Sequence, residues 1–185
     1  MSQLNLIWKI LGTAIIVLSI NGAVFAHEGE VHNDEKEKPA LSAQGKRIVD
    51  TLENYATAVK SGNIAEIEKY VITGDGFSSL EGTFQDLGWD SYRKHLAAEL
   101  PLFHDTEYSL SNIRPYVRGD LAYATTEYIM NVTIKSDQFE GGEHKVAMKG
   151  KATIVLSKSK NEWKIRHIHT SREEPENAQE ENGSH

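Results

Sequence analysis

The sequence predicts an α+β domain in which three N-terminal helices pack on one face of a curved antiparallel meander sheet. Up to about residue 100, apolar residues recur at intervals of three and four, which is typical of amphipathic helices. After His104 they alternate with polar residues in four successive segments separated by turn residues, which favours a strand meander. Helices that precede a run of strands indicate a layer of helices on one side of a sheet.

Three helices follow from this spacing. The first is predicted to begin after Ser42 and to end at residues 61–63, where serine, glycine and asparagine follow one another. Asn63 then caps a second, shorter helix, which is expected to end at the glycines of 74–76. The third is predicted from Trp89 to Leu100, and on it His95 and Glu99 lie one turn apart, close enough to interact.

Five strands are predicted, one of them short. Residues 77–80 form the short strand, and residues 81–83 and 86–88 are expected to be loop. The four long strands of the meander are expected at residues 108–118, 121–135, 144–156 and 163–171.

The last strand carries two histidines. Because side chains of a strand alternate between its faces, Trp163, Ile165, His167 and His169 are predicted to share one face. In one interpretation, both imidazoles are half-buried and bond to backbone or water. In the other, they point into a cavity with this strand as its floor, as ligand donors, proton-transfer groups or metal ligands.

Three segments resemble a known family. They are WDSYRKHLAAEL at 89–100, GDLAYAT at 119–125 and NEWKIRHIHTS at 161–171, and they resemble the SnoaL-like branch of the nuclear transport factor 2 (NTF2) superfamily. The last segment is also similar to the association domain of calcium/calmodulin-dependent kinases. The resemblance implies a conical α+β domain over residues 41–172, frequently a homodimer built through the sheet. It also implies either a small pocket enzyme, such as an isomerase, dehydratase or cyclase, or a non-catalytic binding module.

A pocket of this kind supplies the candidate site residues. His167, His169 and Glu127 are the candidate catalytic groups. Glu127 lies on the face of its strand opposite to the apolar residues. If that face lines the pocket, Glu127 is a candidate base; if that face is the outer one, it is a solvated or dimer-rim carboxylate. The candidate ligand-binding residues come from two helices and the last strand: Tyr55, Trp89, Tyr92, His95, Trp163, His167 and His169. A zinc site made of His95, His167 and His169 is a further hypothesis.

The N-terminus predicts export. A single lysine, Lys9, precedes an apolar run from Ile10 to Ile20, and small residues follow up to Ala26, so residues 1–26 are predicted to be a signal peptide. The run is shorter than the roughly 20 apolar residues that span a bilayer, so no membrane span is expected after cleavage. The chain has no cysteine, and export without disulfides favours a bacterial periplasmic or secreted protein.

Both flanks of the domain are highly charged. Residues 27–40 are predicted to be a disordered lead-in, and residues 173–185 a disordered acidic tail. The lead-in contains His27 and His32 among carboxylates, so metal handling through this segment is one hypothesis for the protein.

Net charge and the absence of certain motifs argue against several classes of partner and chemistry. The formal net charge of −7 argues against nucleic acid or anionic membrane as a partner. The chain has no cysteine, no Gly-x-Ser-x-Gly elbow and no phosphate-binding glycine loop, so nucleophilic catalysis is not expected. No cofactor is expected either. The leading hypothesis is an exported, homodimeric, non-catalytic protein that binds a small molecule, and the main alternative is a cofactor-free enzyme that transfers protons.

Overall fold

The structure, a computed structural model, describes residues 40–173, and residues 41–173 belong to one compact unit. The predicted signal peptide, most of the charged lead-in with His27 and His32, and the acidic tail after residue 173 lie outside the described residues. The described helices are α2 (Ala43–Lys60), α3 (Ile64–Glu68) and α4 (Trp89–Glu99), with a 3-10 turn η1 (Leu100–Leu102). The strands are β1 (Ser78–Glu81), β2 (Phe84–Leu87), β3 (Phe103–Arg118), β4 (Leu121–Lys135), β5 (Glu143–Ser159) and β6 (Glu162–Arg172).

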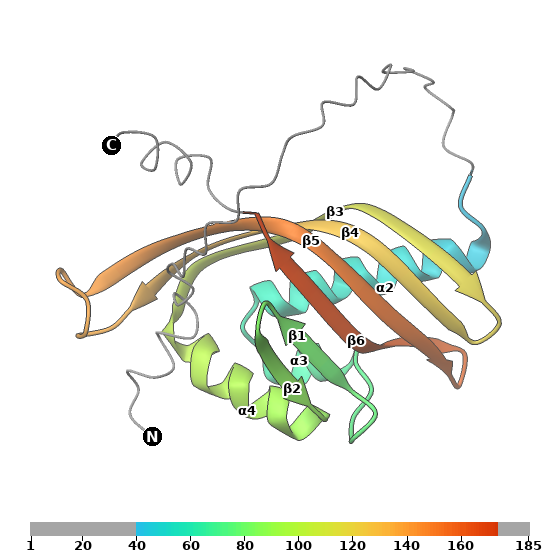
Figure 1. Cartoon of the computed structure of the whole chain (residues 1–185), viewed down its shortest axis with the longest axis horizontal. Helices are drawn as coiled ribbons and strands as arrows, with labels where there is room; N and C mark the ends of the chain where they lie inside the picture. Colours follow the sequence, from blue (N-terminus) through green and yellow to red (C-terminus); the bar gives the residue numbers. More distant parts are fainter. Residues whose placement is uncertain (1–39, 174–185) are drawn as a thin grey trace, which may run out of the picture. The chain divides into compact units, whose positions relative to one another are not determined.

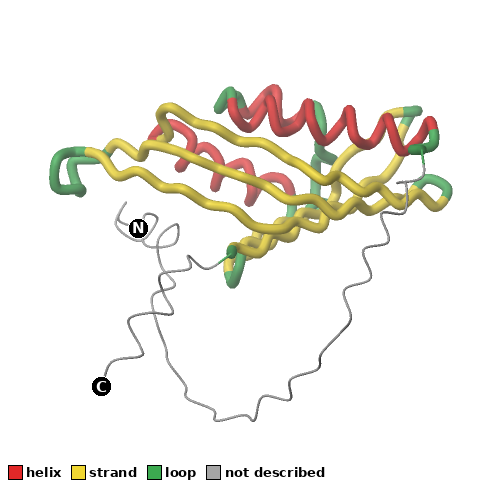
Figure 2. The backbone as a smooth tube through the Cα atoms, turned by 90° about the horizontal axis from the view of Figure 1, so that it is seen from above, coloured by secondary structure: helices red, strands yellow, loops and turns green. Residues whose placement is uncertain are grey.

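These strands form one curved sheet in the order β2-β1-β6-β5-β4-β3. Figure 1 shows the helices gathered on its concave side, and Figure 2 shows from above how the long strands run along them. The predicted meander of four antiparallel strands is confirmed for β3 to β6. We call the side of the sheet that faces the helices the inner face and the opposite side the outer face.

The sheet is mixed rather than purely antiparallel, which corrects the prediction. β1 pairs in parallel with β6, and β2 extends the sheet by pairing antiparallel with β1. The free edge of β6 accepts this short hairpin because an edge strand presents unpaired N–H and C=O groups. β2 was not predicted, and its residues 86 and 87 were expected to be loop, since four residues are too few for a clear alternation of apolar and polar side chains.

α3 is shorter than predicted, because pairing with β6 competes with the helix. Asn63 caps it as expected, with its side chain accepting from the N–H groups of residues 65 and 66. The helix ends at Glu68, and Val71 then forms an isolated parallel bridge with Ile165. The Ile72 N–H donates to the Ile165 carbonyl at 2.8 Å, so the backbone bonds that would have continued the helix are made with the sheet.

The core lies between α2 and the inner face. Ser42 caps α2 as predicted, by accepting from the Gly45 N–H at 3.0 Å. Ile48 and Leu52 of α2 are completely buried, and so are Leu156 of β5 and Ile165 of β6. Each such side chain contributes roughly 1.5–3 kcal/mol relative to an exposed one, and this packing holds the helix against the sheet.

A β-bulge in β6 changes the face on which its second half lies. Leu156 pairs with Ile165, and the preceding Val155 pairs with His167, so Arg166 is an extra residue in the strand. Beyond the bulge Ile168 is the inward residue and is 5% exposed, whereas His169 is exposed. The prediction that both histidines share a face with Trp163 and Ile165 is therefore wrong.

Candidate functional site

The hairpin of β1 and β2 brings carboxylates to the inner face. Asp86 lies opposite Ser79 in the register, and both side chains are buried. Glu81 follows Ser79 by two residues and so points to the same face. α4 packs against this hairpin with Tyr92 inward, and the neighbourhood therefore combines acidic and phenolic groups at one end of the sheet.

His95 of α4 joins two of these carboxylates. Its Nδ1 lies 2.8 Å from Asp86 Oδ2, and its Nε2 lies 2.8 Å from Glu99 Oε1. Burial favours the neutral imidazole, but the hydrogen bonds that Glu99 and Asp86 accept and the charges of Glu99 and Glu81 outweigh it and raise the pKa of His95 to about 9. His95 is thus an imidazolium at neutral pH with both nitrogens engaged. The predicted interaction with Glu99 is confirmed.

Phenol hydroxyls lie beside this ion-pair group. The hydroxyls of Tyr55 on α2 and Tyr92 on α4 are 3.3 Å apart. One of them donates to the other, so the hydroxyl that accepts keeps its own proton for a further partner. Burial raises the pKa values of both tyrosines and of Tyr108 on β3, so all three are neutral hydrogen-bond donors at physiological pH.

Glu81 is the carboxylate whose charge reaches these phenols. Its charge acts on Tyr55, Tyr92, Tyr108 and Tyr128, which come from α2, α4, β3 and β4. Loss of hydration raises the pKa of Glu81; His95 opposes this rise, and Glu99 and Asp86 add to it.

Although its pKa is raised chiefly by loss of hydration, the Glu81 side chain is solvent-exposed. Both properties are expected of a carboxyl that protein surrounds on most sides while water reaches it from one. We give the name interior cluster to Glu81, Asp86, His95, Glu99, Tyr55, Tyr92 and Tyr108.

The structure brings together only some of the residues predicted from sequence. Tyr55, Tyr92 and His95 are members of the interior cluster. Trp89 belongs to the hydrophobic core and meets the Phe77 ring edge-on, with centroids 5.8 Å apart. Trp163 is also a core residue, and its indole N–H donates to Gln44 Oε1 at 3.0 Å.

The three candidate catalytic residues lie elsewhere. His167, His169 and Glu127 are on the outer face, as their register with Val155, Thr153 and Lys151 shows. Glu127 is exposed and accepts from the Asn112 side-chain amide at 2.7 Å. The zinc hypothesis is wrong as well, because His95 and the other two histidines lie on opposite sides of the sheet. Among residues 40–173, no group of three or more histidines and carboxylates is arranged to hold a metal ion.

Sequence reasoning missed Glu81, Asp86 and Tyr108. Glu81 was detectable, because extending the alternation of residues 77–80 by one step puts it on the same face as Phe77. Asp86 was not detectable in this way, since its strand was taken for a loop. Tyr108 was placed on a strand, but nothing in the sequence says which helix side chains its ring faces.

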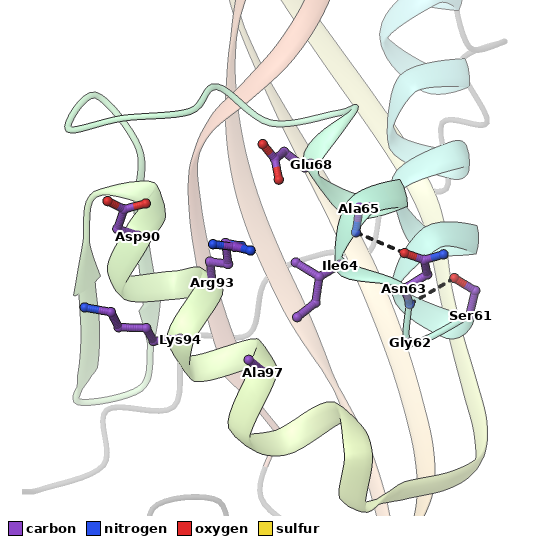
Figure 3. A pocket seen from close by; sticks show the side chains of 10 residues that line it. All are labelled: Ser61, Gly62, Asn63, Ile64, Ala65, Glu68, Asp90, Arg93, Lys94 and Ala97. Carbon is purple, nitrogen blue, oxygen red and sulfur yellow. Dashed lines mark hydrogen bonds between the residues drawn. The ribbon is translucent and has the colours of Figure 1, made fainter.

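A groove of about 880 Å³ lies between α3 and α4. Figure 3 shows side chains of both signs around it, including Glu68, Asp90, Arg93 and Lys94. Its lining includes no member of the interior cluster and no residue of β6, where the sequence predicted the floor of a pocket. The groove is therefore separate from the acidic and phenolic chemistry described above.

Known proteins match this arrangement of helices and sheet. The SnoaL-like domain family matches residues 48–173, which is more than half of the chain. The chain belongs to the SnoaL-like family. The match extends from the middle of α2 to the end of β6, so this SnoaL-like domain includes every strand of the sheet and the whole hairpin that carries Glu81 and Asp86.

Solved structures agree with this SnoaL-like assignment. An NTF2-like superfamily protein from Salmonella enterica serovar Typhimurium is 15% identical, with a TM-score of 0.63 over 71% of this chain and 92% of that chain. A ketosteroid isomerase-like protein from Erwinia carotovora atroseptica is 17% identical, with a TM-score of 0.59 over 73% and 100%. The CaMKII hub of S. rosetta is 17% identical, with a TM-score of 0.55 over 72% and 100%. The TM-scores show that this chain has the NTF2-like fold, and at such low identities they show the fold alone. No curated protein sequence matches the chain.

Proposed function

We propose that this SnoaL-like domain binds a small, uncharged organic molecule at the interior cluster. The observation that carries the proposal is the hydroxyl pair of Tyr55 and Tyr92, 3.3 Å apart, on the inner face beside the ion pairs of His95. The charge of Glu81 reaches the same phenols. The phenols offer hydrogen bonds and aromatic surface, a combination typical of small-molecule sites. The two negative charges of Asp86 and Glu99 exceed the single positive charge of the His95 imidazolium between them, and this net negative charge disfavours an anionic ligand.

Native mass spectrometry of the purified protein tests this proposal. We expect a retained molecule, or one from a panel of neutral phenols and ketones, to add its mass to the wild-type chain. Tyr92→Phe removes one donor hydroxyl but keeps the ring, and it should lower occupancy several-fold, because a lost hydrogen bond costs about 1 kcal/mol. Glu127→Gln is the matched control on the outer face. Equal occupancy in both variants would place the ligand elsewhere.

A second candidate is cofactor-free proton transfer with Glu81 as acid and base. In this reaction ionised Glu81 removes a proton from the carbon next to a carbonyl, the Tyr55–Tyr92 pair donates to the resulting enolate oxygen, and Glu81-H returns the proton to carbon. The raised pKa of Glu81 supports this role, because a base works best when its pKa approaches the working pH.

Deuterium incorporation distinguishes catalysis from binding alone. In heavy water, wild-type protein with its bound carbonyl compound should exchange the adjacent C–H for C–D, and Glu81→Gln should abolish the exchange while retaining the ligand. The rate should rise with pH as Glu81 ionises. A ligand that binds without exchange in the wild type would leave binding as the function.

Two further features belong to the proposal. The protein is exported and acts in the periplasm or outside the cell, supported by the sequence of residues 1–26. N-terminal sequencing of the mature chain should therefore give His27 as the first residue.

Two copies also pair through the outer face. This pairing is supported by exposed aromatic and aliphatic residues there, Tyr116, Leu121, Tyr123 and Ile129.

A further inference from the structure

The bulge at Arg166 leaves two imidazoles side by side on the outer face of β6. Their ring centroids are 6.4 Å apart, with an angle of 60° between the planes. His169 is exposed and His167 is half-buried. Both rings lie away from the interior cluster, so neither the proposed binding site nor the proposed proton transfer uses them.

The distance between the His167 and His169 ring centroids is close to that between two imidazoles bound to one metal ion. Zn–N bonds are about 2.0–2.1 Å, so the centroids of two rings that share an ion lie roughly 5–6 Å apart. A small rotation of the exposed His169 side chain closes the difference. Residues i and i+2 of a strand project to the same side, which lets both rings reach one point above the sheet.

His167 is held in an orientation that suits a ligand. Its Nδ1 lies 2.8 Å from Ser78 Oγ on the neighbouring strand β1. In the tautomer whose Nδ1–H donates to Ser78, the Nε2 lone pair is free. Metal-binding histidines commonly fix the other nitrogen in this way.

We propose that His167 and His169 form a two-imidazole site on the outer face of β6 that binds a divalent transition-metal ion such as Zn²⁺, Cu²⁺ or Ni²⁺. Imidazole nitrogen suits these ions, and the neighbouring residues in the register, Thr153, Val155 and Leu80, add no carboxylate that would favour Mg²⁺ or Ca²⁺. Water completes the coordination.

Metal titration of the full chain tests the site. The background protein carries His27→Ala and His32→Ala, so that these N-terminal residues contribute no imidazole. Isothermal titration calorimetry with Cu²⁺, Ni²⁺ or Zn²⁺ alone should give one ion per chain. His167→Ala and His169→Ala should each weaken binding by roughly tenfold or more, and Ser78→Ala by about tenfold. His104→Ala, at an exposed position on β3, is the matched control and should leave affinity unchanged.

Electron paramagnetic resonance of the Cu²⁺ form gives a readout that does not depend on stability. The background protein should show hyperfine coupling to two imidazole nitrogens, and each single variant should show coupling to one. Unchanged affinity and unchanged coupling in both His167→Ala and His169→Ala would overturn the proposal. Circular dichroism of each variant verifies that the fold is intact during the titration.

Discussion

At the scale of single residues, His95 shows how burial and charge compete. Its side chain is 9% exposed, a setting that favours a neutral ring, yet Asp86 and Glu99 keep it charged. The result is a buried charged group that joins α4 to β2. Because both ring nitrogens are engaged, His95 is better suited to position Asp86 and Glu99 than to exchange protons with a ligand.

The raised pKa of His95 makes stability depend on pH. The folded-state pKa of about 9 exceeds the usual 6.5, so the stabilisation is complete below pH 6.5 and is lost as pH rises through 9. The difference corresponds to about 3 kcal/mol, since each pKa unit is about 1.4 kcal/mol. Urea unfolding of the wild type at several pH values should show this loss between pH 6.5 and 9.

His95→Gln provides the comparison for that measurement. The neutral amide cannot titrate, so the variant should be less stable at pH 6.5 and should lose much less stability than the wild type by pH 9.5. Parallel curves for the two proteins would show that His95 is not charged in the folded state.

At the scale of elements, β6 is shaped by its two neighbours. It pairs antiparallel with β5 throughout, whereas on its other edge it bonds first to Val71 and then to β1. The extra residue at Arg166 falls between these two attachments. As a result of the bulge, Ile165 and Ile168 are both inward although they are three residues apart.

Gly150 of β5 permits β6 to approach closely at its end. A Cβ on Gly150 would overlap the Ser171 carbonyl oxygen and would lie 2.9 Å from Tyr128 Cε1. Gly150→Ala should therefore lower the free energy of unfolding by about 1–3 kcal/mol, the usual cost of overpacking. Chemical denaturation measures the change.

Lys145→Ala, at an exposed position of the same strand, is the control and should change stability by less than about 0.5 kcal/mol. If Gly150→Ala is as stable as this control, the two strands must have room to separate.

At the scale of the whole molecule, the two faces of the sheet have different roles. The inner face carries the core and the interior cluster. The outer face carries the Tyr116–Tyr123 stack, with centroids 4.7 Å apart, and these rings are 52% and 45% exposed. Apolar surface of this kind on a sheet is typical of an interface. The proposed ligand site and the proposed dimer contact are therefore on opposite sides of one layer.

Tyr123→Lys tests the proposed dimer. A lysine opposite Tyr116 removes the stack and places a charge where two copies would meet, so the dimer should weaken by at least tenfold. Sedimentation equilibrium measures the mass. Leu87→Lys also replaces an exposed apolar residue, but on β2 at the far edge of the sheet, and should leave the mass unchanged. A wild-type chain that is monomeric throughout would exclude this interface.

The sequence by itself determined the order of the helices and long strands, the helix caps at Ser42 and Asn63, and the four-strand meander, because capping and alternation are local properties. Only the tertiary structure decided the faces of His167 and His169, since the bulge depends on how β6 meets two separate segments. The tertiary structure also decided the grouping of Tyr55 from α2 with Tyr92 and His95 from α4. Their contacts join residues far apart in the chain, and no local pattern records such distances.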